Sequence, residues 1–331
     1  MAFHTDITQD EFNWAQSKIR VIAAYFEQTV VGQKNLERAL IAALLGNGHV
    51  LLESVPGLAK TTAAKAVADA VGGKFSRIQC TPDLMPSDII GTQIYRPNTG
   101  NFETVLGPVF ANFVLLDEVN RSSAKTQSAM LEAMQEKQVT IGGVTYSLPE
   151  DLFFVVATQN PVEQEGTYPL SEAQSDRFMI KEIITYPTAL EEQEILRRKE
   201  AEYKAAPPKS QMTVEDVKKL QNITSRIYCD DVLKLYISSI VSATRYPDKF
   251  LQPQLRGYVG LGASPRASIA FMKMSKAIAL MQGRVFVTPD DVKLVARQVL
   301  RHRISLKYMA AADGITVETI IDSLLASVHT P

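Results

Sequence analysis

Five short apolar segments in the first 187 residues limit the possible folds of this chain most strongly. Most are separated by helical patterns such as Thr61–Val71, which ends at two glycines. The segments are His49–Glu53, Phe75–Cys80, Phe113–Asp117, Leu152–Thr158 and Met179–Tyr186. Continuous apolar runs, rather than strict alternation with polar residues, are typical of strands buried on both faces. Their alternation with helices predicts an α/β fold, a parallel sheet flanked by helices.

Two further pairs of segments, each joined by a turn sequence, interrupt this alternation and predict β-hairpins. The pairs are Ile94–Pro97 with Phe102–Val105, around Asn98-Thr99-Gly100, and Gln138–Ile141 with Val144–Ser147, around Gly142-Gly143. An open α/β sheet needs neither hairpin, so we expect both to be insertions.

Beyond Pro187 the strand signals fade and helical patterns dominate. A polar helix over Leu190–Tyr203 leads into the linker-like sequence Ala205-Ala206-Pro207-Pro208. Four helical stretches follow, and three begin with capping signals, at Thr213, Ser264 and Thr288. The sequence therefore predicts an α/β core over residues 1–187, a linker helix and Pro-rich connection over 188–210, and a small all-α domain over 211–331.

Composition and charge exclude several classes of protein. The chain has 331 residues, 46% of them hydrophobic, which is not the composition of a disordered protein. The net charge of −1 argues against a general binder of polyanions. It hides a charge of −7 through Pro187 and +6 thereafter. This division has two interpretations: chance with solvated helix faces, or two surfaces that meet within or between subunits.

The chain also lacks the sequence features of exported and membrane-inserted proteins. Its first residues do not follow the order of a signal peptide, and no apolar run has the length of a membrane span. We therefore expect a cytoplasmic protein without membrane insertion. Cys80 and Cys229 lie far apart in the sequence and are expected to be small core residues.

The segment Ser54–Thr61 resembles a P-loop, the phosphate-binding loop between a strand and a helix. Backbone N–H groups at the start of a helix bind phosphate, Lys60 would reach the β- and γ-phosphates of ATP, and the Thr61 hydroxyl would bind Mg²⁺. Ser54 and Ala59 replace the two outer glycines of the pattern. A positive φ at either position would cost on the order of 1 kcal/mol. The predicted nucleotide-binding residues here are Ser54, Val55, Pro56, Gly57, Leu58, Ala59, Lys60, Thr61 and Thr62.

A second motif supports this interpretation, because the apolar strand Phe113–Asp117 ends in two adjacent acids. It resembles a Walker B segment, in which Asp117 would hold Mg²⁺ through water and Glu118 would orient the attacking water. Acids that merely cap the next element are the alternative, and the upstream P-loop disfavours it.

With these motifs the chain resembles the AAA+ ATPases, and more narrowly the MoxR family, over nearly its whole length. The family usually has alanine at Ala59 but glycine at Ser54, so only Ser54 departs from its loop. Val31-Gly32-Gln33 resembles the segment that packs near adenine, and this places Val31 and Gly32 in the nucleotide site. The sequence after Walker B also matches the family, at Asp117–Arg121, Lys125–Gln127 and Leu131–Met134.

The resemblance assigns roles to three further residues. Ala157–Pro161 looks like sensor 1, with Asn160 placed to position the hydrolytic water. Ser171–Phe178 resembles the segment that supplies an arginine finger, Arg177, to a neighbouring subunit. Gly262–Arg266 resembles sensor 2, in which Arg266 would couple the nucleotide state to the angle of the helical lid. The two hairpins match the helix-2 insert and the pre-sensor-1 hairpin of this branch.

Each arginine also has a plainer interpretation. Arg177 could pair with Asp176, and Arg266 could be a surface charge in the first turn of a helix. Arg121 could touch a neighbouring subunit or cap the next helix. The triplet Arg301-His302-Arg303 is typical of cations near a helix end.

The resemblance implies Mg²⁺-dependent ATP hydrolysis in a ring of identical subunits, expected to be a hexamer. The output would be chaperone-like remodelling or maturation of client proteins, with a von Willebrand factor A-domain protein as partner. The alternatives are a nucleic-acid motor, a metal-chelatase subunit and a nucleotide-sensing scaffold. Nucleic acid is the less favoured partner because the hairpins carry only Arg96 and Lys137 as cations.

Overall fold

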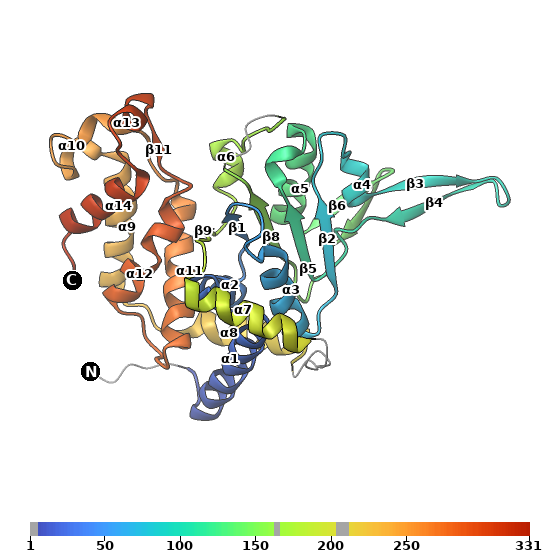
Figure 1. Cartoon of the computed structure of the whole chain (residues 1–331), viewed down its shortest axis with the longest axis horizontal. Helices are drawn as coiled ribbons and strands as arrows, with labels where there is room; N and C mark the ends of the chain where they lie inside the picture. Colours follow the sequence, from blue (N-terminus) through green and yellow to red (C-terminus); the bar gives the residue numbers. More distant parts are fainter. Residues whose placement is uncertain (1–5, 162–165, 203–211) are drawn as a thin grey trace.

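The computed structural model describes residues 6–161, 166–202 and 212–331, and the predicted Ala205–Pro208 linker lies outside these ranges. A five-stranded sheet forms the centre of the fold (Figure 1). Its strands are β1 (Val50–Glu53), β2 (Phe75–Gln79), β5 (Phe113–Asp117), β8 (Phe154–Gln159) and β9 (Ile180–Ile183). They lie in the order β2-β5-β8-β1-β9, and every pairing is parallel. The predicted α/β fold with a parallel sheet is confirmed.

Both faces of the sheet are covered by helices, as continuous apolar strands require. One face packs against α4 (Pro86–Ile90) and α5 (Ala124–Glu136), through side chains such as Leu51, Val114 and Val155. The opposite face, which includes Val50 and Leu115, belongs to the cluster formed with three helices. These helices are α1 (Gln9–Thr29), α2 (Lys34–Leu45) and α3 (Lys60–Val71).

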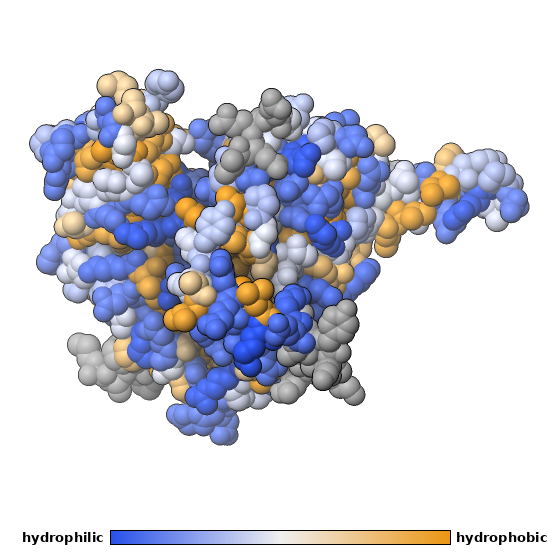
Figure 2. Space-filling model, viewed as in Figure 1, coloured by the Kyte–Doolittle hydropathy of each residue, from blue (hydrophilic) through white to orange (hydrophobic). Residues whose placement is uncertain are grey.

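Both predicted hairpins form. They are β3 (Gly91–Arg96) with β4 (Asn101–Leu106), and β6 (Gln138–Ile141) with β7 (Val144–Ser147). The β3–β4 hairpin is longer than the sequence predicts and projects far from the rest of the molecule (Figure 1). Its exposed apolar residues include Ile94, Phe102 and Leu106, and the tip is hydrophilic (Figure 2).

The remainder of the chain is mostly helical. Its elements are α7 (Ala189–Glu202), α8 (Val214–Arg226), α9 (Asp231–Arg245), α10 (Pro247–Phe250), α11 (Pro265–Met281), α12 (Pro289–Leu300), α13 (Tyr308–Ala312) and α14 (Val317–Ser327). Thr213, Ser264 and Thr288 are the N-caps of α8, α11 and α12, as predicted. The sequence predicts four helices after the linker, whereas the described residues there form seven, two of which, α10 and α13, are single turns.

A small antiparallel pair, β10 (Val259–Leu261) with β11 (Ser305–Leu306), also lies in this region and was not predicted. Strands of two and three residues are too short to show a period-two pattern.

The C-terminal helices rest on the edge of the sheet formed by β9. Helix α11 contacts α2, α12 contacts β9, and one apolar cluster continues from α1, α2 and α3 into α8, α9, α11, α12 and α14. In the ranges described, no helix combines the length and the apolar character needed to cross a membrane.

Candidate functional site

The predicted phosphate loop lies between β1 and α3, at the carboxyl end of the central strands. Helix α3 begins at Lys60, and the described residues provide no side-chain cap at its start. Its first backbone N–H groups are therefore available to an anion. The Lys60 side chain is buried, and its Nζ donates to the carbonyl oxygen of Ser54 at 3.4 Å.

The two substituted glycine positions of the loop behave differently. Ala59 has φ +54°, in the left-handed region, where a Cβ costs about 1 kcal/mol. Ser54 does not have a positive φ, and its buried hydroxyl donates to the carbonyl oxygen of Val55 at 2.9 Å. The departure from the family pattern at Ser54 therefore does not strain the backbone.

A cavity of about 380 Å³ adjoins the loop, within the usual size of small-ligand pockets. Its lining includes residues predicted for the nucleotide site and residues that sequence reasoning missed. The predicted ones are Val31, Gly57, Leu58, Ala59 and Thr62, together with Gln33 of the adenine segment. Gly32, with φ +67°, lies against Glu191 at the start of α7.

Helix α7 forms the wall of this cavity that sequence reasoning missed, through Ile195, Arg198 and Lys199. Arg198 donates to the carbonyl oxygens of Glu27 at 2.7 Å and Gln28 at 3.0 Å, and so ties α7 to the end of α1. The basic residues in this otherwise acidic helix were the available signal.

Asp117 and Glu118 follow β5 at the same end of the sheet, and both are held by hydrogen bonds. The buried Asp117 accepts from the Thr158 hydroxyl at 2.8 Å and from Arg77 at 2.6 Å. Glu118 has φ +57°, and its N–H donates to the Thr158 hydroxyl at 2.8 Å. Strained backbone of this kind is common at functional sites.

The Glu118 carboxylate has two partners, Gln79 Nε2 at 3.1 Å and Arg121 Nη1 at 3.2 Å. Helix α5 is capped by Ser123, so the predicted capping role of Arg121 is wrong. Arg77 and Gln79 were missed, although polar residues at alternate positions of the edge strand β2 were a visible signal.

Asn160 follows β8, the strand between β5 and β1, and is buried. Its carbonyl oxygen accepts from Asn120 Nδ2 at 3.4 Å. The carboxyl ends of neighbouring parallel strands lie side by side. The structure therefore brings Lys60, Asp117, Glu118 and Asn160 together at the carboxyl ends of β1, β5 and β8.

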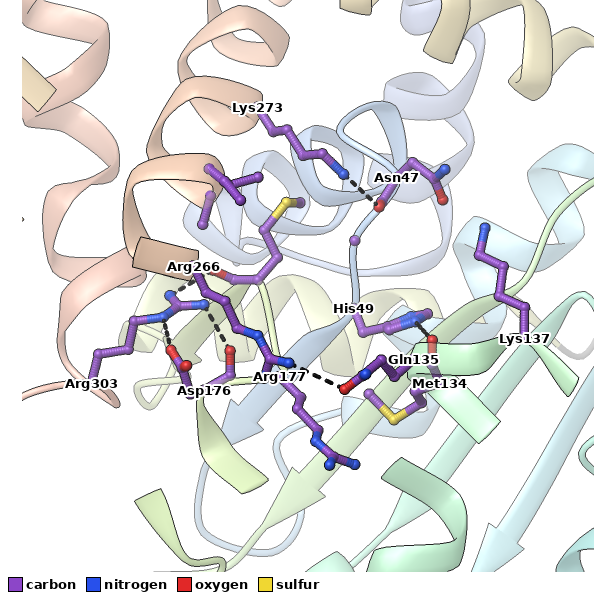
Figure 3. Close-up of a pocket in the computed structure, with 14 residues that line it drawn as sticks. Asn47, His49, Met134, Gln135, Lys137, Asp176, Arg177, Arg266, Lys273 and Arg303 are labelled. Carbon is purple, nitrogen blue, oxygen red and sulfur yellow. Dashed lines mark hydrogen bonds and ion pairs between the residues drawn. The ribbon is translucent and has the colours of Figure 1, made fainter. Parts of the chain in front are cut away.

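Arg177 and Arg266 lie at the opposite side of the sheet, near the amino ends of β1 and β9. Arg177 precedes β9, where the Met179 N–H donates to the carbonyl oxygen of His49, the residue before β1. The four residues of β1 place its amino end about 13 Å from its carboxyl end, where the phosphate loop begins. Both arginines line a second cavity, of about 240 Å³ (Figure 3).

This second cavity is strongly cationic. Lys137, Lys273 and Arg303 line it together with the two arginines, and Asp176 is the carboxylate among the lining residues. Burial, with the nearby charge of Lys137, lowers the pKa of Lys273. Positive charge that lacks compensation is typical of a site for an anion.

The two arginines differ in their contacts. Arg266 Nη2 donates to Gln135 Oε1 at 3.1 Å. The Arg177 side chain has no hydrogen-bond or ion-pair partner among the described residues. The alternative pairing of Arg177 with Asp176 is wrong, because Asp176 pairs with Arg303.

The fold and these sites define a P-loop protein with a helical lid, and comparisons with known proteins agree. The model of the ATPase family associated with various cellular activities matches residues 49–180, and the model of the AAA lid domain matches residues 256–324. A solved structure from Cytophaga hutchinsonii, described as a candidate ATPase, superposes with a TM-score of 0.91 at 45% identity, over 98% of both chains.

Two relatives match at the level of sequence. The chain is 47% identical over 312 residues to Chaperone MoxR1 of Mycobacterium tuberculosis, covering 93% of this chain and 81% of that protein. It is 44% identical over 307 residues to YeaC of Bacillus subtilis, covering 93% of each. The chain belongs to the MoxR family of AAA+ ATPases.

Proposed function

We propose that this protein hydrolyses ATP in a ring of identical subunits, with each active site completed by the next subunit. The observation that carries the proposal is that the two parts of the site lie at opposite ends of the parallel strands. The phosphate loop and Glu118 lie at the carboxyl ends, and Arg177, without a partner among the described residues, lies at the amino ends. One subunit alone would leave the negative charge of the transition state without its arginine.

The residues at the carboxyl ends of the strands suit the binding of a nucleotide with Mg²⁺. Backbone N–H groups at the start of α3 and the Lys60 ammonium would bind phosphate, and the cavity beside Val31 would take the base. The Thr61 hydroxyl would bind Mg²⁺ and the Asp117 carboxylate would hold it through water, and Mg²⁺ prefers such hard oxygen donors. When bound, Mg²⁺ would neutralise charge on the β- and γ-phosphates.

Hydrolysis would then follow from the positions of two side chains. Glu118 would accept a proton from the attacking water while Asn160 orients that water. The water oxygen forms a bond to the γ-phosphorus, and the bond to the bridging oxygen of ADP breaks. To reach the water, Glu118 would exchange its hydrogen bonds with Gln79 and Arg121 for this contact.

Arg177 and Arg266 would act on the neighbouring subunit's γ-phosphate, since a guanidinium can bind two of its oxygens. Such a head-to-tail contact closes into a ring, for which we propose six subunits. The charge of −7 on residues 1–187 and +6 on the remainder would steer this contact. We propose residues 1–187 as the core, 188–210 as the connection and 211–331 as the lid.

The work of the ring would be done on other proteins. The name of the relative Chaperone MoxR1 supports a chaperone-like role, in which ATP turnover remodels or matures a client. A von Willebrand factor A-domain protein is the partner we propose.

Replacing Glu118 with glutamine tests the proposed chemistry. The amide cannot accept the proton, so we expect steady-state ATP turnover to fall about a hundredfold while ATP binding persists. Glu132, an exposed carboxylate on α5, offers a control, and Glu132→Gln should turn over ATP at the wild-type rate. Unchanged turnover in Glu118→Gln would remove Glu118 from its role.

A further inference from the structure

A buried ion pair fastens the lid to the segment that carries Arg177. Arg303 follows α12, and its side chain is only 2% exposed. Its Nε lies 2.8 Å from Oδ1 of Asp176, the residue that precedes Arg177 (Figure 3). A buried guanidinium requires a carboxylate partner and further hydrogen bonds, and Arg303 has both.

All five N–H donors of the Arg303 guanidinium are satisfied. Besides the bond to the carboxylate, Nη2 donates to the carbonyl oxygens of Asp176 at 3.2 Å and Phe178 at 2.6 Å. Nη1 donates to the carbonyl oxygens of Met179 at 3.0 Å and Val299 at 2.5 Å. A lysine has three donors and lacks the planar fork, so it could not reproduce this set.

The same carboxylate also reaches the helix that carries Arg266. Oδ2 of Asp176 accepts from the Ser264 hydroxyl at 2.7 Å. The Ser264 oxygen in turn accepts from the Arg266 N–H at 3.1 Å, which caps α11. The Asp176 carboxylate therefore contacts both Arg303 and Ser264, the N-cap of the helix that carries Arg266. Arg177 is the next residue in the chain, so its backbone is held by the same contacts.

Residues on either side of Arg303 extend this attachment. The His302 ring is hydrogen-bonded to the carbonyl oxygen of Phe178 at 3.1 Å, and Arg301 Nη1 donates to the carbonyl oxygen of Lys181 at 3.2 Å. The expected place of residues 301–303 near a helix end is confirmed, because α12 ends at Leu300. The structure adds that these side chains hold the start of β9.

We propose that Asp176 and Arg303 are positioning residues that set Arg177 and Arg266 for the neighbouring subunit's nucleotide. The lid and the two arginines then move as one body. This inference rests on the proposed action of Arg177 between subunits. Neither residue would contact the nucleotide of its own subunit, since both lie near the amino ends of the strands and Lys60 lies at the carboxyl ends.

Arg303→Lys tests the proposal, because it keeps the charge opposite Asp176 and removes the fork. We expect ATP affinity and KM within about threefold of wild type, and kcat lower by about tenfold or more, since a small misplacement of a catalytic group is costly. The control is Arg284→Lys, which alters another ion pair of the lid, with Asp291 at 2.6 Å. Its kcat should stay within about twofold of wild type, whatever its thermal stability.

Mixed rings separate a positioning defect from a general loss of structure. Lys60→Ala subunits have no working phosphate loop but keep Arg177, so mixing them with Arg303→Lys should restore turnover. Arg177→Ala subunits lack the finger, so mixing them with Arg303→Lys should restore none. Restored turnover in this second mixture, or a wild-type kcat in Arg303→Lys alone, would overturn the proposal.

Asp176→Asn provides a second variant if Arg303→Lys fails to fold, because it keeps an acceptor for Ser264 and removes the charge. The same pattern in the two mixtures is expected, and the same results would overturn the proposal. Full turnover by Arg177→Ala alone would instead refute the proposed function, so the two failures are distinguishable.

Discussion

The free energy of unfolding is expected to depend on pH because of His49, the residue before β1. Its Nδ1 accepts from the Val155 N–H at 3.1 Å, and its Nε2 lies 3.3 Å from the carbonyl oxygen of Met134. These bonds suit a neutral ring. Burial lowers the pKa of His49 to about 4, from 6.5 in the unfolded chain.

Because the folded pKa is the lower one, the unfolded chain binds more protons below about pH 6.5. The stability contributed by His49 is complete above that pH and is lost as the pH falls toward 4. Between pH 8 and pH 5 the expected loss in the free energy of unfolding is about 2 kcal/mol. Burial also lowers the pKa of His302, which adds a loss in the same direction.

Urea unfolding of wild type and His49→Gln at pH 8 and pH 5 measures this difference. The glutamine amide does not titrate, so the drop between the two pH values should be smaller by about 2 kcal/mol in the variant. His329→Gln, at an exposed position near the C-terminus, should keep the wild-type drop. An equal drop in wild type and His49→Gln would refute the reasoning.

Three further predictions concern the nucleotide site. Ser54→Gly should leave ATP affinity within about twofold in calorimetry, because Ser54 has no positive φ and its carbonyl oxygen still accepts from Lys60; a gain of tenfold would contradict this. Arg198→Ala should weaken binding of a fluorescent ATP analogue by about fivefold to thirtyfold, since it removes two hydrogen bonds of about 1 kcal/mol each that hold α7 against α1; unchanged affinity would show that α7 does not shape the cavity. Chelation of Mg²⁺ should abolish turnover, and a rate in chelator within twofold of the full rate would exclude a role for Asp117 and Thr61 in metal binding.

Much of the architecture could be predicted because its signals are local. The strands are short apolar runs bounded by turn residues, and the hairpin β6–β7 forms over the predicted residues around Gly142-Gly143. The cap residues Thr213 and Ser264 were recognisable for the same reason, since an N-cap acts within one turn of its helix.

The features that escaped prediction depend on contacts between distant parts of the chain. The pairing of β9 beside β1 sets which strand Arg177 lies next to, and no local pattern encodes the order of strands. The partner of Asp176 lies more than a hundred residues away at Arg303, whereas the sequence offers only the adjacent Arg177 as an alternative partner. The ion pair of Arg77 with Asp117 is a similar case, because it depends on the pairing of β2 with β5.

Mixing two inactive variants tests the central claim most directly. Arg177→Ala keeps the phosphate loop, Lys60→Ala keeps the arginine, and each alone should show almost no ATP turnover. In an equimolar mixture that exchanges subunits at random, about a quarter of the interfaces join an intact loop to an intact arginine, so about a quarter of wild-type turnover should return. Turnover that stays at the level of the separate variants, despite demonstrated mixed rings, would contradict a site shared between subunits.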